Sequence, residues 1–212
     1  MNRVAFLIDG FNVYHSAVSA SRDLVGATTK WLNLRALCES YLYLVGGDAQ
    51  IVSVHYFSAL ATHLQDVKPD VIKRHLTLIE CLRATGVTVE LGRFKQKTVH
   101  CDACRRQIIR HEEKETDVAI AVRLLELFVR STCDTAVIVT GDTDVAPAVR
   151  CLQQLFPAAR VLFAFPYGRK NQELAKLAPG SFSLRKEQYA KFQFPDPFVT
   201  PNGRKIYKPA KW

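Results

Sequence analysis

Short apolar runs alternate with longer amphipathic segments along most of this chain. Five runs have the length and the β-branched or aromatic content of strands: Val4–Ile8, Ile51–Phe57, Val87–Leu91, Ala136–Val139 and Val161–Phe165. Amphipathic spacing predicts helices over Leu32–Leu44, Pro69–Thr85, Thr116–Ser131, Asp144–Phe156 and Asn171–Leu177. Because such alternation is typical of βαβ units, the sequence predicts an α/β fold around a mainly parallel sheet of about five strands.

Local signals refine two of these helices. Pro69 suits the first turn of its helix, and Gly86 suits the stop that follows. Within Thr116–Ser131, apolar residues recur at helical spacing and predict one broad face that packs on the sheet, made of Val118, Ala121, Val122, Leu125 and Phe128.

Two polar segments interrupt the alternation. Residues 92–115 carry seven Lys/Arg and four acids and enclose a Cys-x-x-Cys pair, so we interpret them as an insertion in a domain of residues 1–184. Residues 185–212 form a basic arm rich in prolines and aromatics. Its four prolines predict a strap without regular helix, and Asn202-Gly203 predicts a hairpin turn.

Composition and charge narrow the class of protein. The 212 residues are 48% hydrophobic, enough for one well-packed α/β domain. With 29 Lys and Arg against 20 acids, the net charge of +9 favours a polyanionic partner, nucleic acid before an acidic membrane surface. The first apolar run is too short to span a membrane, and the scattered Cys38, Cys81, Cys133 and Cys151 suit buried thiols; a cytoplasmic protein is expected.

Acidic residues follow the predicted strands. Asp9 ends the first strand with Asn12 just beyond, Asp142 and Asp144 follow the fourth, and Asp117 opens a helix. Each acid alone also suits a turn, a helix cap or the helix dipole. Together at one edge of a parallel sheet they would repel one another unless a cation lay between them. Oxygen ligands select Mg²⁺ or Mn²⁺, which activate water in phosphodiester cleavage.

Three motifs carry a resemblance to a known family. "FLIDGFNVY", "EEKETDVAIAV" and "VTGDTDVAPAV", in this order, resemble the NYN domains of the PIN-like nuclease superfamily from about Arg3 to Leu184. The resemblance implies a three-layer α/β/α domain and a metal-dependent ribonuclease. It also implies that Asn12 orients substrate or water and that four acids bind metal in catalysis: Asp9, Asp117, Asp142 and Asp144. The cysteine-containing insertion marks a subgroup.

The cysteine pair and its basic neighbours leave several interpretations open. Cys101 and Cys104 have the spacing of half a zinc site, which His100 or His111, or the same pair of a second subunit in a homodimer, could complete. A redox motif and no special role remain alternatives. Basic residues near the predicted metal site suit an RNA backbone, although a solvated loop would look the same: Arg105, Arg106, Arg110, Arg169 and Lys170.

The leading hypothesis is therefore a Mg²⁺- or Mn²⁺-dependent ribonuclease acting on RNA. A non-catalytic RNA-binding or scaffold protein and a structure-specific DNA nuclease are the alternatives, because no residue identifies a reader of the 2′-hydroxyl. A phosphatase with an aspartyl nucleophile is disfavoured, since Phe11 stands where an Asp-x-Asp motif would need its second acid. No glycine-rich nucleotide-binding motif is present in the sequence.

Overall fold

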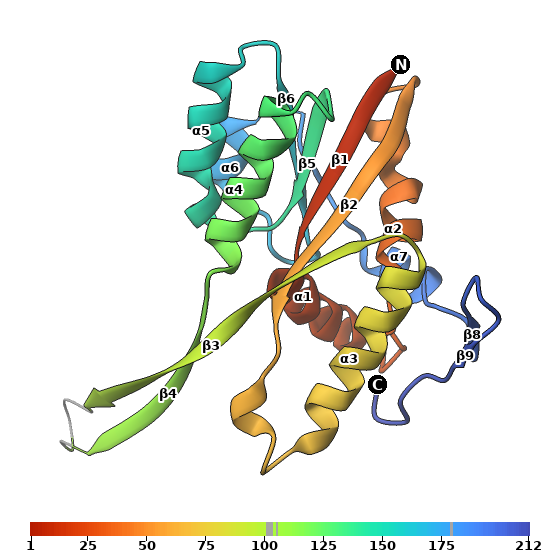
Figure 1. Ribbon diagram of the computed structural model, residues 1–212, viewed down its shortest axis with the longest axis vertical. Coiled ribbons are helices and arrows are strands. Elements are labelled where there is room, and N and C mark those ends of the chain that lie inside the picture. Colours follow the sequence, from red (N-terminus) through yellow and green to blue (C-terminus); the bar gives the residue numbers. More distant parts are fainter. Residues whose placement is uncertain (101–103, 105, 179) are drawn as a thin grey trace.

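The computed structural model describes residues 1–100, 104, 106–178 and 180–212. A twisted sheet forms its centre, with helices on both faces (Figure 1). The α/β class is confirmed, but the sheet has seven strands rather than five, in the order β4-β3-β2-β1-β5-β6-β7. The strands are β1 Asn2–Asp9, β2 Ala49–Ala59, β3 Thr88–His100, β4 Gln107–Lys114, β5 Thr135–Val139, β6 Arg160–Phe165 and β7 Phe182–Ser183.

Parallel pairing places β1 at the centre of the sheet. β2 and β3 follow on one side of β1, and β5, β6 and β7 follow on the other, so the strand order reverses at β1. All these neighbours are parallel, whereas β4 is antiparallel to β3. The carboxyl ends of β1 and β5 therefore border the crevice where α/β proteins bind ligands.

The predicted insertion is a long β-hairpin. Only residues 88–92 of β3 pair with β2; residues 93–100 pair instead with β4 and project from the body (Figure 1). The short apolar run Val87–Leu91 predicted the first part of this strand alone. Residues beyond Gly92 are mostly exposed on both faces, so they lack the apolar run that would have marked them as a strand.

Seven α-helices cover the sheet in the described part of the chain. Five correspond to predicted helices, whereas α1 and α7 were not predicted. α1 buries mainly small residues such as Ser16 and Ala17, which give little apolar periodicity, and α7 precedes the first proline of the arm. The helices are α1 Gly10–Asp23, α2 Leu34–Tyr41, α3 Pro69–Ala84, α4 Thr116–Val129, α5 Ala146–Leu155, α6 Gln172–Leu177 and α7 Lys186–Lys191.

The arm that the prolines were predicted to keep free of helix therefore begins with one. After α7 the arm forms a short antiparallel hairpin, β8 Phe198–Val199 with β9 Lys205–Ile206. The turn lies at Asn202-Gly203, so the prediction of a hairpin turn is confirmed.

The face that α4 turns to the sheet differs from the predicted one. Ile120 and Leu124 are fully buried, whereas Val118 and Val122 are 66% and 59% exposed. α4 is apolar on nearly every side, so helical spacing alone could not decide which stripe meets the sheet.

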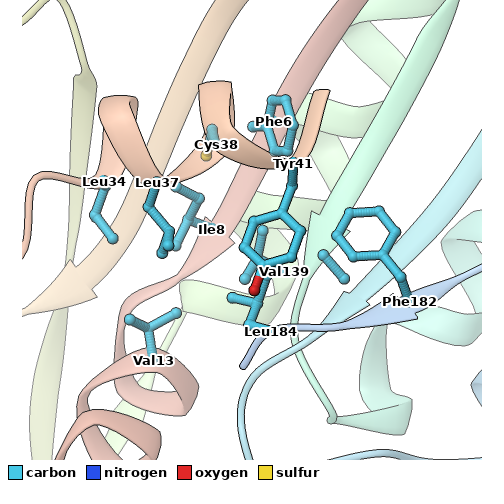
Figure 2. A pocket seen from close by; sticks show the side chains of 11 residues that line it. Phe6, Ile8, Val13, Leu34, Leu37, Cys38, Tyr41, Val139, Phe182 and Leu184 are labelled. Carbon is cyan, nitrogen blue, oxygen red and sulfur yellow. The ribbon is translucent and has the colours of Figure 1, made fainter. Parts of the chain in front are cut away.

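Two cores fill the two faces of the sheet. α4, α5 and α6 cover one, and α1, α2, α3 and α7 cover the other. Beneath α2, Tyr41 stacks on Phe182 beside Leu184, and the remaining space is about 10 Å³, hardly room for one water (Figure 2). No described helix has the length and apolar content needed to cross a membrane.

Candidate metal centre

The loop after β5 forms the floor of the crevice. Ile8 pairs with Val139, so Asp9 and Thr140 are neighbours at the ends of their strands. A Cβ on Gly141 would lie 2.3 Å from the carbonyl oxygen of Arg169, a distance no side chain tolerates. Glycine at position 141 therefore lets this loop pack against the loop that follows β6.

Three carboxylates meet above this floor. Oxygens of Asp117, Asp142 and Asp144 lie within 4.8 Å of one another. Asp117 is in the first turn of α4, and Asp142 caps the 3₁₀ turn Thr143–Val145, accepting a hydrogen bond from the backbone N–H of Asp144 at 3.1 Å. Burial, and then the charges of Asp9, Asp142 and Asp144, raise the pKa of Asp117 to about 6. A divalent cation would relieve this repulsion.

Asp9 is not part of this group of three, although its charge acts on Asp117. Its side chain is buried, only 4% exposed, and caps α1 by accepting from the backbone N–H of Asn12 at 2.9 Å. It also accepts from the Asn12 amide at 2.5 Å and the Thr140 hydroxyl at 2.8 Å. Burial raises the pKa of Asp9, while these hydrogen bonds oppose the rise. Asp9 thus adds negative charge and ties the ends of β1 and β5 together.

Asn12 links the acids to a basic loop. Its side-chain oxygen accepts from the N–H of Gly141 at 3.3 Å and from the guanidinium of Arg169 at 3.5 Å. With Lys170 and Asn171, these residues border an open polar hollow of about 390 Å³ beside the carboxylates. Hydrogen bonds therefore connect Asn12 and Arg169 to Asp9, and Lys170 lines the same hollow as these two residues.

Glu113, near the end of β4, is a further carboxylate beside Asp117 and is not one of the four predicted acids. It accepts hydrogen bonds from the backbone N–H and the hydroxyl of Thr116. Burial, and then the charges of Asp117 and Asp9, raise its pKa to about 7. Its position in "EEKETD", four residues before Asp117, could have suggested that it lies near the centre. The polar pattern of residues 92–115 does not predict how β3 and β4 pair, however, so it does not place Glu113.

Five other predicted residues fall in or next to the hairpin segment of the sequence. Cys101 and Arg105 are outside the described residues, whereas Cys104, Arg106 and Arg110 are exposed.

The two candidate histidines on the hairpin lie apart along it. His100 ends β3, but His111 stacks on His63 with ring centres 4.2 Å apart, four residue pairs closer to the body.

Part of the hairpin's charge is neutralised within the chain. Arg93 pairs with Glu115 at 2.7 Å, and Lys97 pairs with Glu112 at 3.1 Å. The structure gives no such ion pair for Arg106 or Arg110 among the described residues, so these two are the better placed for an external anion.

Comparisons with known proteins agree with this architecture. The family model of the NYN domain matches residues 3–184. A curated relative, 6-hydroxy-3-succinoylpyridine 3-monooxygenase HspA of Pseudomonas putida, is 26% identical over 243 residues, covering 99% of this chain and 75% of the relative. A solved structure of a protein of unknown function from Vibrio parahaemolyticus is 20% identical, with a TM-score of 0.53 over 87% of this chain and 93% of that one. The last likeness concerns the fold alone.

Proposed function

The chain belongs to the NYN domain family, and from that premise we propose that it is a metal-dependent ribonuclease. The observation that carries the proposal is the group of Asp117, Asp142 and Asp144 at the reversal of strand order. These three side chains offer only oxygen ligands, which suit Mg²⁺ or Mn²⁺. A cation held there would lower the pKa of a bound water and stabilise the oxygen that leaves in phosphodiester cleavage.

The surrounding residues have distinct parts in this proposal. Asp9 fixes Asn12 through two hydrogen bonds, so the Asn12 amide is held beside the carboxylates. Arg169 and Lys170 border the open hollow next to them and can hold the phosphate adjacent to the one being cleaved. An open, polar site suits a polymer that enters from the side.

RNA is proposed as the substrate because of the family resemblance. The net charge of +9 fits any nucleic acid and does not distinguish RNA from DNA.

A second candidate follows from the Pseudomonas putida relative. Its name describes a 3-monooxygenase of 6-hydroxy-3-succinoylpyridine, and the match covers 99% of this chain. We favour nucleic-acid hydrolysis because the three converging carboxylates would then bind the metal ion that the reaction needs. Assaying both activities in one preparation separates the two.

The test incubates the purified protein with single-stranded RNA and with DNA of the same sequence, in Mn²⁺, Mg²⁺ or EDTA. RNA should be cut only with metal, and Asp142→Asn should slow cutting by at least about a hundredfold, since changes outside the ligand shell alone cost about 10- to 100-fold. Asp66→Asn, an exposed acid on the loop before α3, is the matched control and should cut normally.

Three other outcomes would contradict the proposal. Cutting that survives EDTA or Asp142→Asn would indicate a contaminating nuclease. Binding of RNA without cutting would favour the scaffold alternative. Conversion of 6-hydroxy-3-succinoylpyridine in the presence of a reductant and oxygen, with no cutting of nucleic acid, would favour the second candidate.

A further inference from the structure

A cavity of about 260 Å³ lies between α1, the end of β2 and α3. Val13, Tyr14 and Ala17 of α1 line it, whereas Asn12 and Ser19, on the opposite side of the helix, line the open hollow. The end of β2, helix α3 and Trp212 of the arm form its other walls. The cavity is therefore separate from the metal centre, although both contact the first turns of α1.

The cavity is partly open to solvent and is much larger than a gap between packed core side chains. Protein interiors are close-packed, and the gap beneath α2 on the same face of the sheet measures about 10 Å³. An engineered cavity of about 150 Å³ binds benzene, and drug-sized ligands occupy pockets from about 300 Å³ upward. A volume of about 260 Å³ suits a molecule of one or two rings with a short substituent.

Aromatic side chains form much of the wall. Phe11, Tyr14, Tyr56 and Trp212 all border the cavity. Gly10 lets the Tyr56 ring lie against the first turn of α1, because a Cβ at position 10 would come within 2.7 Å of the ring. Flat apolar faces of this kind favour a planar aromatic ligand.

One cation on the wall has no partner in the described part of the chain. Arg74 of α3 lines the cavity, and its Nε is buried without a hydrogen bond. None of the ion pairs among the described residues includes Arg74. Lys30 is a second cation on the wall, and no Asp or Glu is among the described lining residues. A planar guanidinium left without an acceptor fits a carboxylate, which can accept two parallel hydrogen bonds.

A neutral polar pair completes the wall. The Tyr56 hydroxyl lies 3.4 Å from Nε2 of His75. Burial lowers the pKa of His75 to about 4, so its ring is neutral near pH 7. This pair suits a hydroxyl or ring nitrogen of the ligand rather than a second negative charge.

We propose that this cavity binds a small aromatic carboxylate, with the ring between Tyr56 and Trp212 and the carboxylate on Arg74. This ligand site is additional to the proposed nuclease centre, and its test needs no nucleic acid and no metal.

The test measures binding of 1-naphthoate to the full chain in EDTA by calorimetry. Binding of one molecule per chain is expected, and naphthalene-1-carboxamide, which lacks the charge, should bind at least about tenfold more weakly. Arg74→Gln should weaken binding of naphthoate by at least about tenfold, whereas Arg83→Gln, an exposed position on the same helix, should leave it unchanged. Val71→Phe, which fills the cavity without changing its charge, should abolish binding.

Melting temperatures of the three variants show whether each one folds. Equal affinity for the carboxylate and the carboxamide, retention of binding in folded Arg74→Gln, or no binding of naphthoate up to millimolar concentration would each overturn the proposal. Nucleoside monophosphates that bind through Arg74 while naphthoate does not would also overturn it, because the cavity would then be a subsite for a nucleotide.

Discussion

The carboxylate of Asp9 illustrates how one residue can serve the fold and the centre at once. It caps α1 and accepts from Asn12 and Thr140, so its removal would leave three donors without this acceptor: the backbone N–H and side-chain amide of Asn12 and the buried hydroxyl of Thr140. Asp142, by contrast, is exposed and faces two other acids. The two aspartates should therefore respond to substitution in opposite ways.

We expect Asp9→Ala to lower the free energy of unfolding by about 2–3 kcal/mol, the sum of a lost cap and unpaired partners. Asp142→Asn should raise the metal-free stability slightly, by up to about 1 kcal/mol, because it removes one of the repelling charges. Urea unfolding in EDTA measures both. Loss of stability in Asp142→Asn would show that the carboxylates do not repel one another in the metal-free protein.

His55, on β2, gives a prediction about pH. Its side chain is 6% exposed, and neither ring nitrogen has a hydrogen-bond partner among the described residues. Burial, and then the charge of Arg123, lower its pKa to about 4. The unfolded chain therefore binds more protons at this site between pH 4 and about 6.5. Protonation of His55 in the unfolded chain should therefore lower the free energy of unfolding by up to about 3 kcal/mol as the pH falls through that range.

His55→Leu, which keeps the volume but cannot titrate, should flatten this dependence. The difference in unfolding free energy between variant and wild type should grow as the pH falls from 7.5 to 5. His15→Gln, at an exposed position, is the control and should leave the profile unchanged. A constant difference for His55→Leu at all pH values would contradict the assignment.

At the scale of elements, the sequence predicted what short-range patterns determine. Apolar runs predicted five of the strands, and Asp142 was predicted as a site residue because it comes just after the buried strand β5. The hairpin of β3 and β4 is largely exposed on both faces and lacks the apolar alternation that marks a strand, so the sequence did not predict where Glu113 would lie. Arg74 was missed because the cavity that it lines requires α1, α3 and the arm to come together.

The cysteine pair yields a prediction at the same scale. Cys104 is exposed, four residues after His100, which ends β3. Cys101 directly follows His100 in the sequence but lies outside the described residues. His111 stacks on His63, so His100 is the better placed to complete a zinc site. We expect protein purified without added metal to retain zinc.

Elemental analysis measures that zinc directly. Cys101→Ser with Cys104→Ser should lose it, and Cys151→Ser, an exposed cysteine elsewhere, should keep it. Less than about a tenth of an equivalent in the unaltered protein would indicate free thiols.

At the scale of the whole molecule, the distribution of charge decides where a nucleic acid could bind more than the net charge does. The net charge of +9 coexists with an acidic centre, so a phosphate backbone could bind there only if cations beside the centre offset its repulsion. Arg169 and Lys170 border the centre, while Arg106 and Arg110 lie on the projecting hairpin. This arrangement suits a strand that runs across the crevice and along the hairpin.

If these cations hold the backbone, RNA affinity should fall steeply with salt. Each neutralised phosphate contributes about −0.7 to the slope of log K against log salt for a single strand, so four contacts predict roughly a fiftyfold loss between about 50 and 200 mM. Replacing Arg106 and Arg110 by Ala should make the slope shallower by about 1.4. Arg83→Ala with Lys73→Ala, two exposed cations on α3, should change it less, and Asp142→Asn should leave it unchanged while improving affinity. The RNA affinities at each salt concentration are measured in EDTA, where metal-dependent cutting is suppressed. A slope unaffected by the hairpin replacements would mean that the hairpin is solvated and that the RNA contacts only the rest of the protein.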